Sequence, residues 1–328
     1  MKAIKILTMA ALATAVFASC SNEDGLPQSN YPADNVVRIM TSVDGMNTRA
    51  SYGNSADKLK SFGFCIKNAN SEKYTYDNIK VSQKRYNWIP ATQMLWQNST
   101  TAVDILAYAP YQETTEDANG KVKVFGKTDY AFSVKEDQSN AEDYSSDLIV
   151  FKQTGFTPVL ELNTSKAVEV AFTHLLSQLN LIIELRDQFN TNNNTVTKGF
   201  VTDVKVNGTI ISSKVDFSAS PISVQVDGTQ TAAITPETTG FTPAENATAH
   251  AVFNYSAIVI PQTVAAGNFS ISFKVNNTEY IWTATDAVTF ESGKKHELHL
   301  LAGKDVVQGG AISAKPWGKE TITEKETD

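Results

Sequence analysis

The sequence predicts an all-β protein made of two β-sandwich domains in tandem. Short runs rich in β-branched and aromatic residues recur along the chain and are separated by Asn, Gly, Asp and Pro, which is typical of sandwich strands and their turns. No long window has the 3.6-residue period of an amphipathic helix. The 328 residues are enough for two domains of ordinary size.

The strands expected in the first half of the chain end at a polar segment. They are residues 36–43, 62–67, 74–81, 103–108, 130–134, 148–151, 168–172 and 179–185. The polar segment runs from Asp187 to Thr195 and has little to bury, so we place the domain boundary there, with the turn at residues 154–158 as an alternative. This gives an N-terminal sandwich over residues 50–187 and a C-terminal sandwich over residues 188–328.

The strands expected in the second half include one clear hairpin. The runs are residues 201–206, 222–226, 251–260, 269–275, 280–284 and 296–301. Polar and apolar residues alternate strictly from Phe269 to Val275, and Asn276 and Asn277 follow. Because Asn tolerates positive φ, this pair predicts a tight turn into residues 278–284.

The first 19 residues predict a signal peptide. Lys2 and Lys5 precede an apolar run of about a dozen residues, and small residues follow it. A membrane-spanning helix needs about 20 apolar residues, so this run is too short to be a stable anchor by itself. We expect it to direct export and then to be removed.

Cys20 stands directly after this signal. Phe17-Ala-Ser-Cys20 resembles a lipobox, in which the cysteine becomes the first mature residue and its sulfur takes a diacylglyceryl group; Phe replaces the usual Leu. Acyl chains on Cys20 would hold the protein on a membrane without a spanning helix. An ordinary secretory signal with an incidental cysteine is the alternative. Glu23 and Asp24 resemble an acidic signal for surface display.

Charge and cysteine content exclude some functions. The net charge falls from −7 to −9 when Lys2 and Lys5 leave, because no acidic residue precedes Cys20. Such a surface repels phosphate backbones, so we expect no nucleic-acid partner. Cys65, the other cysteine, lies in an apolar strand-like run and is predicted to be buried and unreactive.

The sequence carries no recognisable catalytic or metal site. His296 and His299 are three apart, so on a strand they point to opposite faces and cannot chelate one ion. His174 is expected to donate to a backbone carbonyl at a strand-to-turn corner, with catalysis as the alternative. Phosphate-binding glycine loops, nucleophile elbows and paired-cysteine sites are absent from the sequence. We therefore expect no enzyme, no cofactor and no metal.

The segment Val168-Glu-Val-Ala-Phe-Thr-His-Leu-Leu-Ser-Gln-Leu-Asn-Leu-Ile-Ile183 resembles the fimbrillins, subunits of the type V pili of Gram-negative gut and oral anaerobes. Further segments follow in the family's order: Val103-Asp-Ile-Leu-Ala-Tyr-Ala-Pro110, Asp147-Leu-Ile-Val150, Ile258-Val-Ile-Pro-Gln262, Val288-Thr-Phe-Glu-Ser-Gly293 and Trp317. Each motif alone is weak evidence for the family, whereas the order of all of them along the chain is specific to it. The resemblance covers nearly the whole mature chain and implies two transthyretin-like β-sandwiches without an active site.

The resemblance also implies how such a chain assembles. Fimbrillins reach the cell outer membrane as lipoproteins, and in polymerising members an arginine-specific surface protease cuts the N-terminal segment away. The loss of a strand leaves a groove, which a terminal strand of a neighbouring subunit fills. The expected function is therefore that of a shaft or tip subunit of a pilus (fimbrium), which binds other pilin subunits and supports adhesion.

The expected cut falls between Arg49 and Ala50, where a propeptide-like segment over residues 20–49, which contains the first strand, meets the first sandwich. Small and polar residues surround Arg49, as an exposed protease site requires; a solvated loop charge is the alternative. Arg38 lies inside the preceding expected strand. In that strand Val37, Ile39 and Val43 are predicted to face the core and Arg38 and Ser42 to face outward, a period-two pattern that Met40 and Thr41 interrupt.

The expected donor strand lies at residues 311–323. Its candidate side chains are Ile312, Ala314 and Trp317. Pro316 has no N–H, which limits pairing to an edge or an end. The alternative is a last strand of its own domain followed by an acidic tail.

A surface lipoprotein that keeps its lipid is the competing function. It would be a fimbrial anchor, or a glycan-binding protein with an aromatic platform. The candidate platform residues are Trp88, Trp96, Tyr108 and Tyr111, although aromatic residues at strand positions are also typical of a core.

Overall fold

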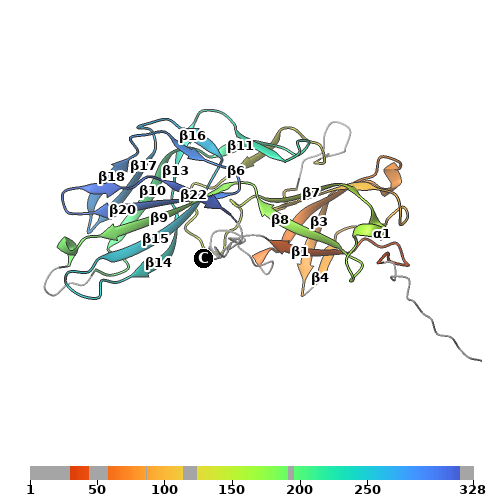
Figure 1. The fold of residues 1–328 in the computed structure, drawn as a ribbon, viewed down its shortest axis with the longest axis horizontal. Coiled ribbons are helices and arrows are strands. Elements are labelled where there is room, and N and C mark those ends of the chain that lie inside the picture. Colours follow the sequence, from red (N-terminus) through yellow and green to blue (C-terminus); the bar gives the residue numbers. More distant parts are fainter. Residues whose placement is uncertain (1–29, 44–57, 86, 114–123, 191–195, 318–328) are drawn as a thin grey trace, which may run out of the picture.

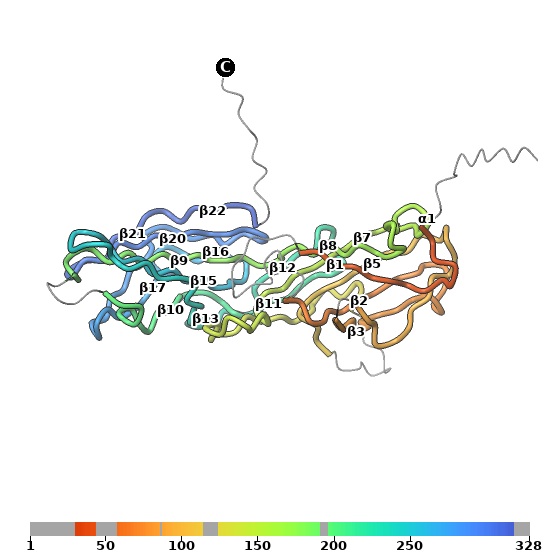
Figure 2. Tube along the Cα trace, turned by 90° about the horizontal axis from the view of Figure 1, so that it is seen from below, coloured from red at the N-terminus to blue at the C-terminus, as the bar shows by residue number. Residues whose placement is uncertain are grey.

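The computed structural model describes residues 30–43, 58–85, 87–113, 124–190 and 196–317. The predicted all-β fold is confirmed. The strands form two lobes side by side along the longest axis, which gives an elongated molecule (Figures 1 and 2). The helical turns include α1 (Pro158–Glu161) and the 3-10 turns Glu72–Tyr74 and Asp187–Phe189. Over the described ranges, no helix has the length and apolar character that crossing a membrane requires.

One lobe contains a seven-stranded sheet with the order β1-β8-β7-β5-β2-β3-β4. Its strands are β1 (Ile39–Val43), β2 (Ser61–Lys67), β3 (Tyr76–Lys84), β4 (Asn87–Pro90), β5 (Val103–Ala109), β7 (Ile149–Phe156) and β8 (Val168–His174). β1 runs parallel to β8, and the other neighbouring strands are antiparallel. β1 and β4 are therefore the two edges of this sheet.

The central strands β2 and β5 bury side chains on both faces. Phe64 and Ile105 lie in a core shared with β1 and β8, whereas Cys65 and Tyr108 lie in a second core on the opposite face. Phe217 packs against Tyr108 with the ring centroids 5.6 Å apart. Burial on both faces explains why these strands read as nearly continuous apolar runs.

The other lobe is built mainly from a six-stranded and a four-stranded sheet. The six-stranded sheet contains β14 (Glu237–Thr242), β15 (Ala251–Val259), β9 (Ser177–Leu185), β20 (Lys294–Ala302), β21 (Val307–Gly309) and β22 (Ser313–Pro316). The four-stranded sheet contains β13 (Thr231–Ile234), β10 (Val201–Ile210), β17 (Ser270–Val275) and β18 (Thr278–Thr283). β16 (Gln262–Val264) pairs with β19 (Val288–Phe290).

The hairpin predicted from the alternating run is confirmed. β17 and β18 pair in antiparallel register, with Val275 opposite Thr278. Asn276 and Asn277 adopt φ values of 47° and 67°, which Asn tolerates better than most residues. The turn chemistry therefore fixes the register of this pair.

The chain passes between the lobes at residues 175–176. β8 ends in the seven-stranded sheet, and β9 pairs with β15 and β20 in the six-stranded sheet. The polar segment at residues 187–195, where the sequence predicted a boundary, follows β9. Leu175 and Leu176 are buried, so no polar linker marks the change of sheet.

A small third sheet ties the lobes together. β6 (Tyr130–Ser133) pairs with β11 (Ser212–Asp216), which also pairs with β12 (Ser223–Val226). From β7, the Lys152 ammonium donates to the carbonyl oxygens of Phe217, Ser218 and Ala219 at 2.8, 3.0 and 2.8 Å.

Candidate functional site

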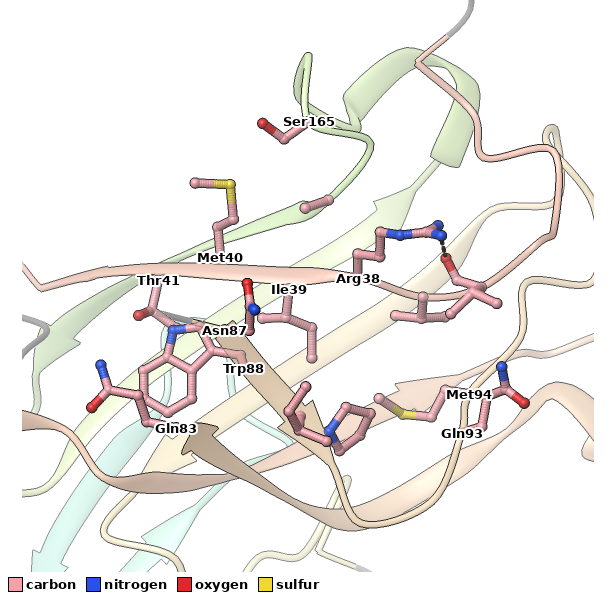
Figure 3. A pocket seen from close by; sticks show the side chains of 15 residues that line it. Arg38, Ile39, Met40, Thr41, Gln83, Asn87, Trp88, Gln93, Met94 and Ser165 are labelled. Atoms are coloured by element: carbon pink, nitrogen blue, oxygen red, sulfur yellow. Dashed lines mark hydrogen bonds between the residues drawn. The ribbon is translucent and has the colours of Figure 1, made fainter. Parts of the chain in front are cut away.

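The segment that contains β1 forms one edge of the seven-stranded sheet and also contacts the chain that follows β4, the other edge. On one side β1 pairs with β8, with Ile39 opposite Val168. On the other side the Val37 N–H donates to the Met94 carbonyl oxygen at 3.0 Å. Figure 3 shows this strand running along the rim of a groove. The segment thus partly closes an otherwise open sheet.

The side chains of this segment alternate regularly. Val37, Ile39 and Val43 are buried, with exposed fractions of 2, 7 and 4%, as predicted. Met40 is 46% exposed and Thr41 is half-buried, so these two residues continue the alternation, and the predicted interruption is wrong. Met40 is a long apolar side chain at an outward position, so the two-residue period could not be recognised from the sequence.

The groove between β1 and β4 has a volume of about 810 Å³. Its walls come from β1, β4 and the segments next to them, including Arg38, Ile39, Thr41, Gln83, Asn87, Trp88, Ile89, Pro90, Gln93 and Met94 (Figure 3). Arg38 is paired with Asp34 at 2.6 Å, and hydrogen bonding from Arg38 lowers the pKa of Asp34 to about 2. The groove therefore combines apolar and amide surface with one compensated charge.

The expected donor strand lies on the chain's own six-stranded sheet. β22 pairs antiparallel with β20, with Ala314 opposite His296 and Pro316 opposite Lys294. All four residues of β22 are exposed, whereas the preceding Ile312 is half-buried. β22 is therefore an edge strand that buries few of its own side chains.

Trp317 anchors the end of β22 in the core. Its side chain is buried, and its backbone N–H donates to the Gly293 carbonyl oxygen at 2.9 Å. The indole stacks on the His174 imidazole with the ring centroids 3.8 Å apart. The Lys295 ammonium lies 5.9 Å from the indole centroid. This contact joins the last described residue to the end of β8.

The expected carbonyl partner of His174 is wrong. His174 Nδ1 lies 2.9 Å from Asp147 Oδ1, and both side chains are fully buried. A carboxylate satisfies a buried imidazole N–H at least as well as a carbonyl does. Both residues occur in the motifs singled out in the sequence, but nothing local pairs them.

The other histidines have structural partners. His296 is buried, and its Nε2 accepts a hydrogen bond from the Glu291 N–H at 3.0 Å; burial lowers the pKa of His296. His299 is exposed and lies 2.6 Å from Glu184, which also bonds to His250. Within the described part of the chain, no group of three or more His, Cys, Asp or Glu side chains is arranged to hold a metal ion.

Cys65 is fully buried in β2. Its sulfur accepts a hydrogen bond from the Asn78 N–H at 3.2 Å. Burial raises the pKa of the thiol well above its usual value, so Cys65 stays protonated and weakly nucleophilic.

Two of the four expected platform aromatics are core residues. Trp96 stacks on Phe156 with centroids 5.7 Å apart, and Tyr108 is fully buried and donates to Asn78 at 2.6 Å. A platform role for Trp96 or Tyr108 is therefore wrong. Trp88 and Tyr111 remain partly exposed. Cys20, Arg49 and Ala50 lie outside the described residues.

Comparison with protein families gives one match that covers most of the chain. Residues 48–317 match the model of a family described as fimbrillin-like. The match begins after β1 and ends at Trp317. No curated protein matches the chain.

Several solved structures share the fold. A candidate cell adhesion protein from Bacteroides uniformis is 18% identical over 87% of this chain and 99% of its own, with a TM-score of 0.56. A second one, from Bacteroides ovatus, is 13% identical over 87% and 98%, with a TM-score of 0.59. A fimbrial protein from Bacteroides vulgatus is 17% identical over 85% and 99%, with a TM-score of 0.52. At these identities the likeness is one of fold.

Proposed function

The chain belongs to the fimbrillin-like family, and from this premise we propose that it is a structural subunit, shaft or tip, of a type V pilus on the cell surface. Its partners are other pilin subunits, and adhesion follows from polymerisation. The observation that carries this proposal is the position of β1, an edge strand with buried side chains that leads directly into the segment containing Arg49.

The contacts of β1 suit a strand that can be exchanged. Val37, Ile39 and Val43 are buried, and full burial of three aliphatic side chains contributes about 5 to 9 kcal/mol before ordering costs. Removal of β1 would expose this apolar surface together with the N–H and C=O groups along the free edge of β8. Such an edge favours a new strand from another chain.

The N-terminal residues control when the exchange happens. The chain is exported with its signal, and Cys20 carries a lipid that holds residues 20–49 on the outer membrane. An arginine-specific surface protease then cuts between Arg49 and Ala50. Cutting releases both the lipid and β1, because both precede Arg49 in the chain.

The incoming strand comes from residues 311–323 of a neighbouring subunit. β22 lies at an edge of its own sheet with four exposed residues, so it can leave that sheet at small cost apart from its anchor Trp317. Ile312 and Ala314 share one face of an extended strand and are suited to the sites that Ile39 and Val37 vacate. Pro316 ends the pairing.

Arg49→Ala and Arg49→Lys test whether cleavage after Arg49 is required for polymerisation. An arginine-specific protease should cut the wild-type chain first after Arg49, and the product should form higher oligomers in size-exclusion chromatography. Both variants should remain uncut there and monomeric, and Arg49→Lys separates the loss of the cut from the loss of charge. Polymerisation of either variant at the wild-type rate would contradict the proposal and favour an anchor subunit that keeps its lipid.

A synthetic peptide of residues 311–323 tests the donor. It should bind the cut subunit saturably in fluorescence anisotropy and leave the uncut Arg49→Lys chain unbound. Replacement of Ile312 by Asp in the peptide should abolish binding, because a carboxylate would enter an apolar site. Equal binding to cut and uncut chains would show that β1 does not occupy the acceptor site.

A further inference from the structure

Trp88 presents part of its indole to the groove between β1 and β4. The ring packs edge-on against Phe62, with the centroids 5.0 Å apart and an interplanar angle of 65°. This contact holds the indole in place. Because the side chain is only partly buried, an aromatic surface remains open along the groove (Figure 3).

Three primary amides line the groove near Trp88. Gln83 lies directly opposite Trp88 in the β3–β4 ladder, Asn87 is the first residue of β4, and Gln93 follows that strand. Their side-chain amides make no hydrogen bond with any other residue that the structure describes. The Thr41 hydroxyl on the opposite wall is buried and likewise has no partner within that part of the chain. Each amide can both donate and accept.

The charge of the groove is already compensated. Arg38 is the charged residue among those that line it, and both of its terminal nitrogens bond to the Asp34 carboxylate, at 3.0 and 2.6 Å. An anionic ligand would have to break this pair. The ligand that fits is therefore neutral, with a flat apolar face for the indole and several hydroxyl groups for the amides.

We propose that this groove binds a neutral oligosaccharide, with Trp88 stacking on a sugar ring and Gln83, Asn87 and Gln93 bonding its hydroxyls. A volume of about 810 Å³ lies within the range of small-ligand sites, and a mostly apolar wall with a few convergent polar groups is their usual composition. This inference goes beyond the assembly role and concerns the chain before cleavage at Arg49, while β1 still forms one wall of the groove.

An extended peptide fits the groove less well. A strand added to β4 would have to bond to the backbone N–H groups of β4 that point away from β3. The Ala91 N–H donates to the Lys80 carbonyl oxygen of β3. Because the direction alternates along a strand, the backbone groups of Trp88 and Pro90 are the ones that point away from β3, toward the groove. Pro90 has no N–H. β4 therefore offers one outward donor, too few for a stable ladder.

The binding test uses the full chain with Arg49→Ala, which keeps β1 and the groove in place. On an array of neutral and acidic oligosaccharides this chain should bind neutral members saturably. Titration of the chain with an oligosaccharide that binds on the array should change the tryptophan fluorescence of the protein. Trp88→Ala should weaken binding by about tenfold or more.

Two further variants keep the test decisive if Trp88→Ala is unstable. Gln83→Ala with Asn87→Ala leaves the Trp88–Phe62 contact intact and should weaken binding about fivefold or more, the equivalent of about one hydrogen bond. Trp282→Ala removes a similarly half-buried indole from β18 in the other lobe and should leave binding unchanged.

Three outcomes would overturn the inference. The first is no saturable binding of neutral oligosaccharides by a folded chain. The second is binding that neither Trp88→Ala nor the double amide variant weakens. The third is saturable binding of extended peptides in preference to saccharides, which would make the groove a strand-binding site. None of these outcomes depends on whether cut subunits polymerise.

Discussion

The indole of Trp317 and the imidazole of His174 lie parallel, with an interplanar angle of 4° and 3.8 Å between their centroids. Trp317 closes the last strand of one lobe, and His174 ends β8 of the other. The buried Asp147 carboxylate lies 2.9 Å from Nδ1 at the edge of the same imidazole and holds the ring in place. This stack is therefore a point where the sheets of both lobes and the end of β22 meet.

Trp317→Ala should detach β22. Loss of a buried Trp costs about 3 to 5 kcal/mol, and the remaining side chains of β22 are exposed. We expect a fall of that size in the free energy of unfolding and faster amide exchange in β22. Lys315→Ala, on the exposed part of the same strand, should change stability by less than about 0.5 kcal/mol. Unchanged exchange in Trp317→Ala would show that the ladder with β20 holds β22 without its anchor.

Acidification should destabilise the fold through His296. Burial lowers the pKa of His296, so below its ordinary value of about 6.5 the unfolded chain binds a proton more readily than the folded chain. The free energy of unfolding should therefore be insensitive to this group above about pH 6.5 and should fall as the pH drops further. In His296→Gln, which keeps an acceptor for the Glu291 N–H, the fall between pH 7.5 and pH 5 should be smaller. Equal falls in urea titrations would contradict this assignment.

Lys152 should stabilise the junction through its three carbonyl contacts. Lys152→Met removes all of them, and water can replace part of the loss at the exposed Ser218. We expect a loss of about 1.5 to 3 kcal/mol, the value of one charged hydrogen bond. Lys198→Met, at an exposed position, is the matched control and should stay within about 0.5 kcal/mol of wild type. Equal stability of the two variants in urea would argue against this role.

Most strands with an apolar run could be predicted from sequence, and several short or polar strands could not. Every run marked as a strand overlaps a strand of the structure, because most of those strands contain buried apolar side chains. The strands that were missed include β4, β13, β14 and β19. β14 is mostly polar, β13 has four residues, β19 has three residues and β4 ends in Pro90. Such short or polar runs carry too little apolar pattern to be recognised, even where the partner is the adjacent strand, as for β4 and β14.

The site could be predicted in part for the same reason. Val37 and Ile39 mark the inward face of β1 by their spacing. The Asp147–His174 bond joins residues 27 apart, and the His174–Trp317 stack joins residues from opposite lobes. No local sequence pattern predicts either contact. The groove around Trp88 also depends on tertiary structure, since β1 and β4 meet only after the whole sheet has formed.

The last prediction concerns the orientation of β1. Ile39 faces the core with 7% exposure, and its neighbour Met40 faces outward with 46% exposure. Ile39→Asp places a carboxylate among apolar side chains and should cost about 3 kcal/mol or more, whereas Met40→Asp should cost about 0.5 kcal/mol or less. Because β1 is an edge strand, the damage should first appear locally, as faster amide exchange in β1 and along the edge of β8. If β1 is the strand that assembly replaces, the uncut Ile39→Asp chain should also bind the peptide of residues 311–323, which the uncut Met40→Asp chain should not. A pair of variants with equal stability and equal peptide binding would mean that β1 does not fill the acceptor site.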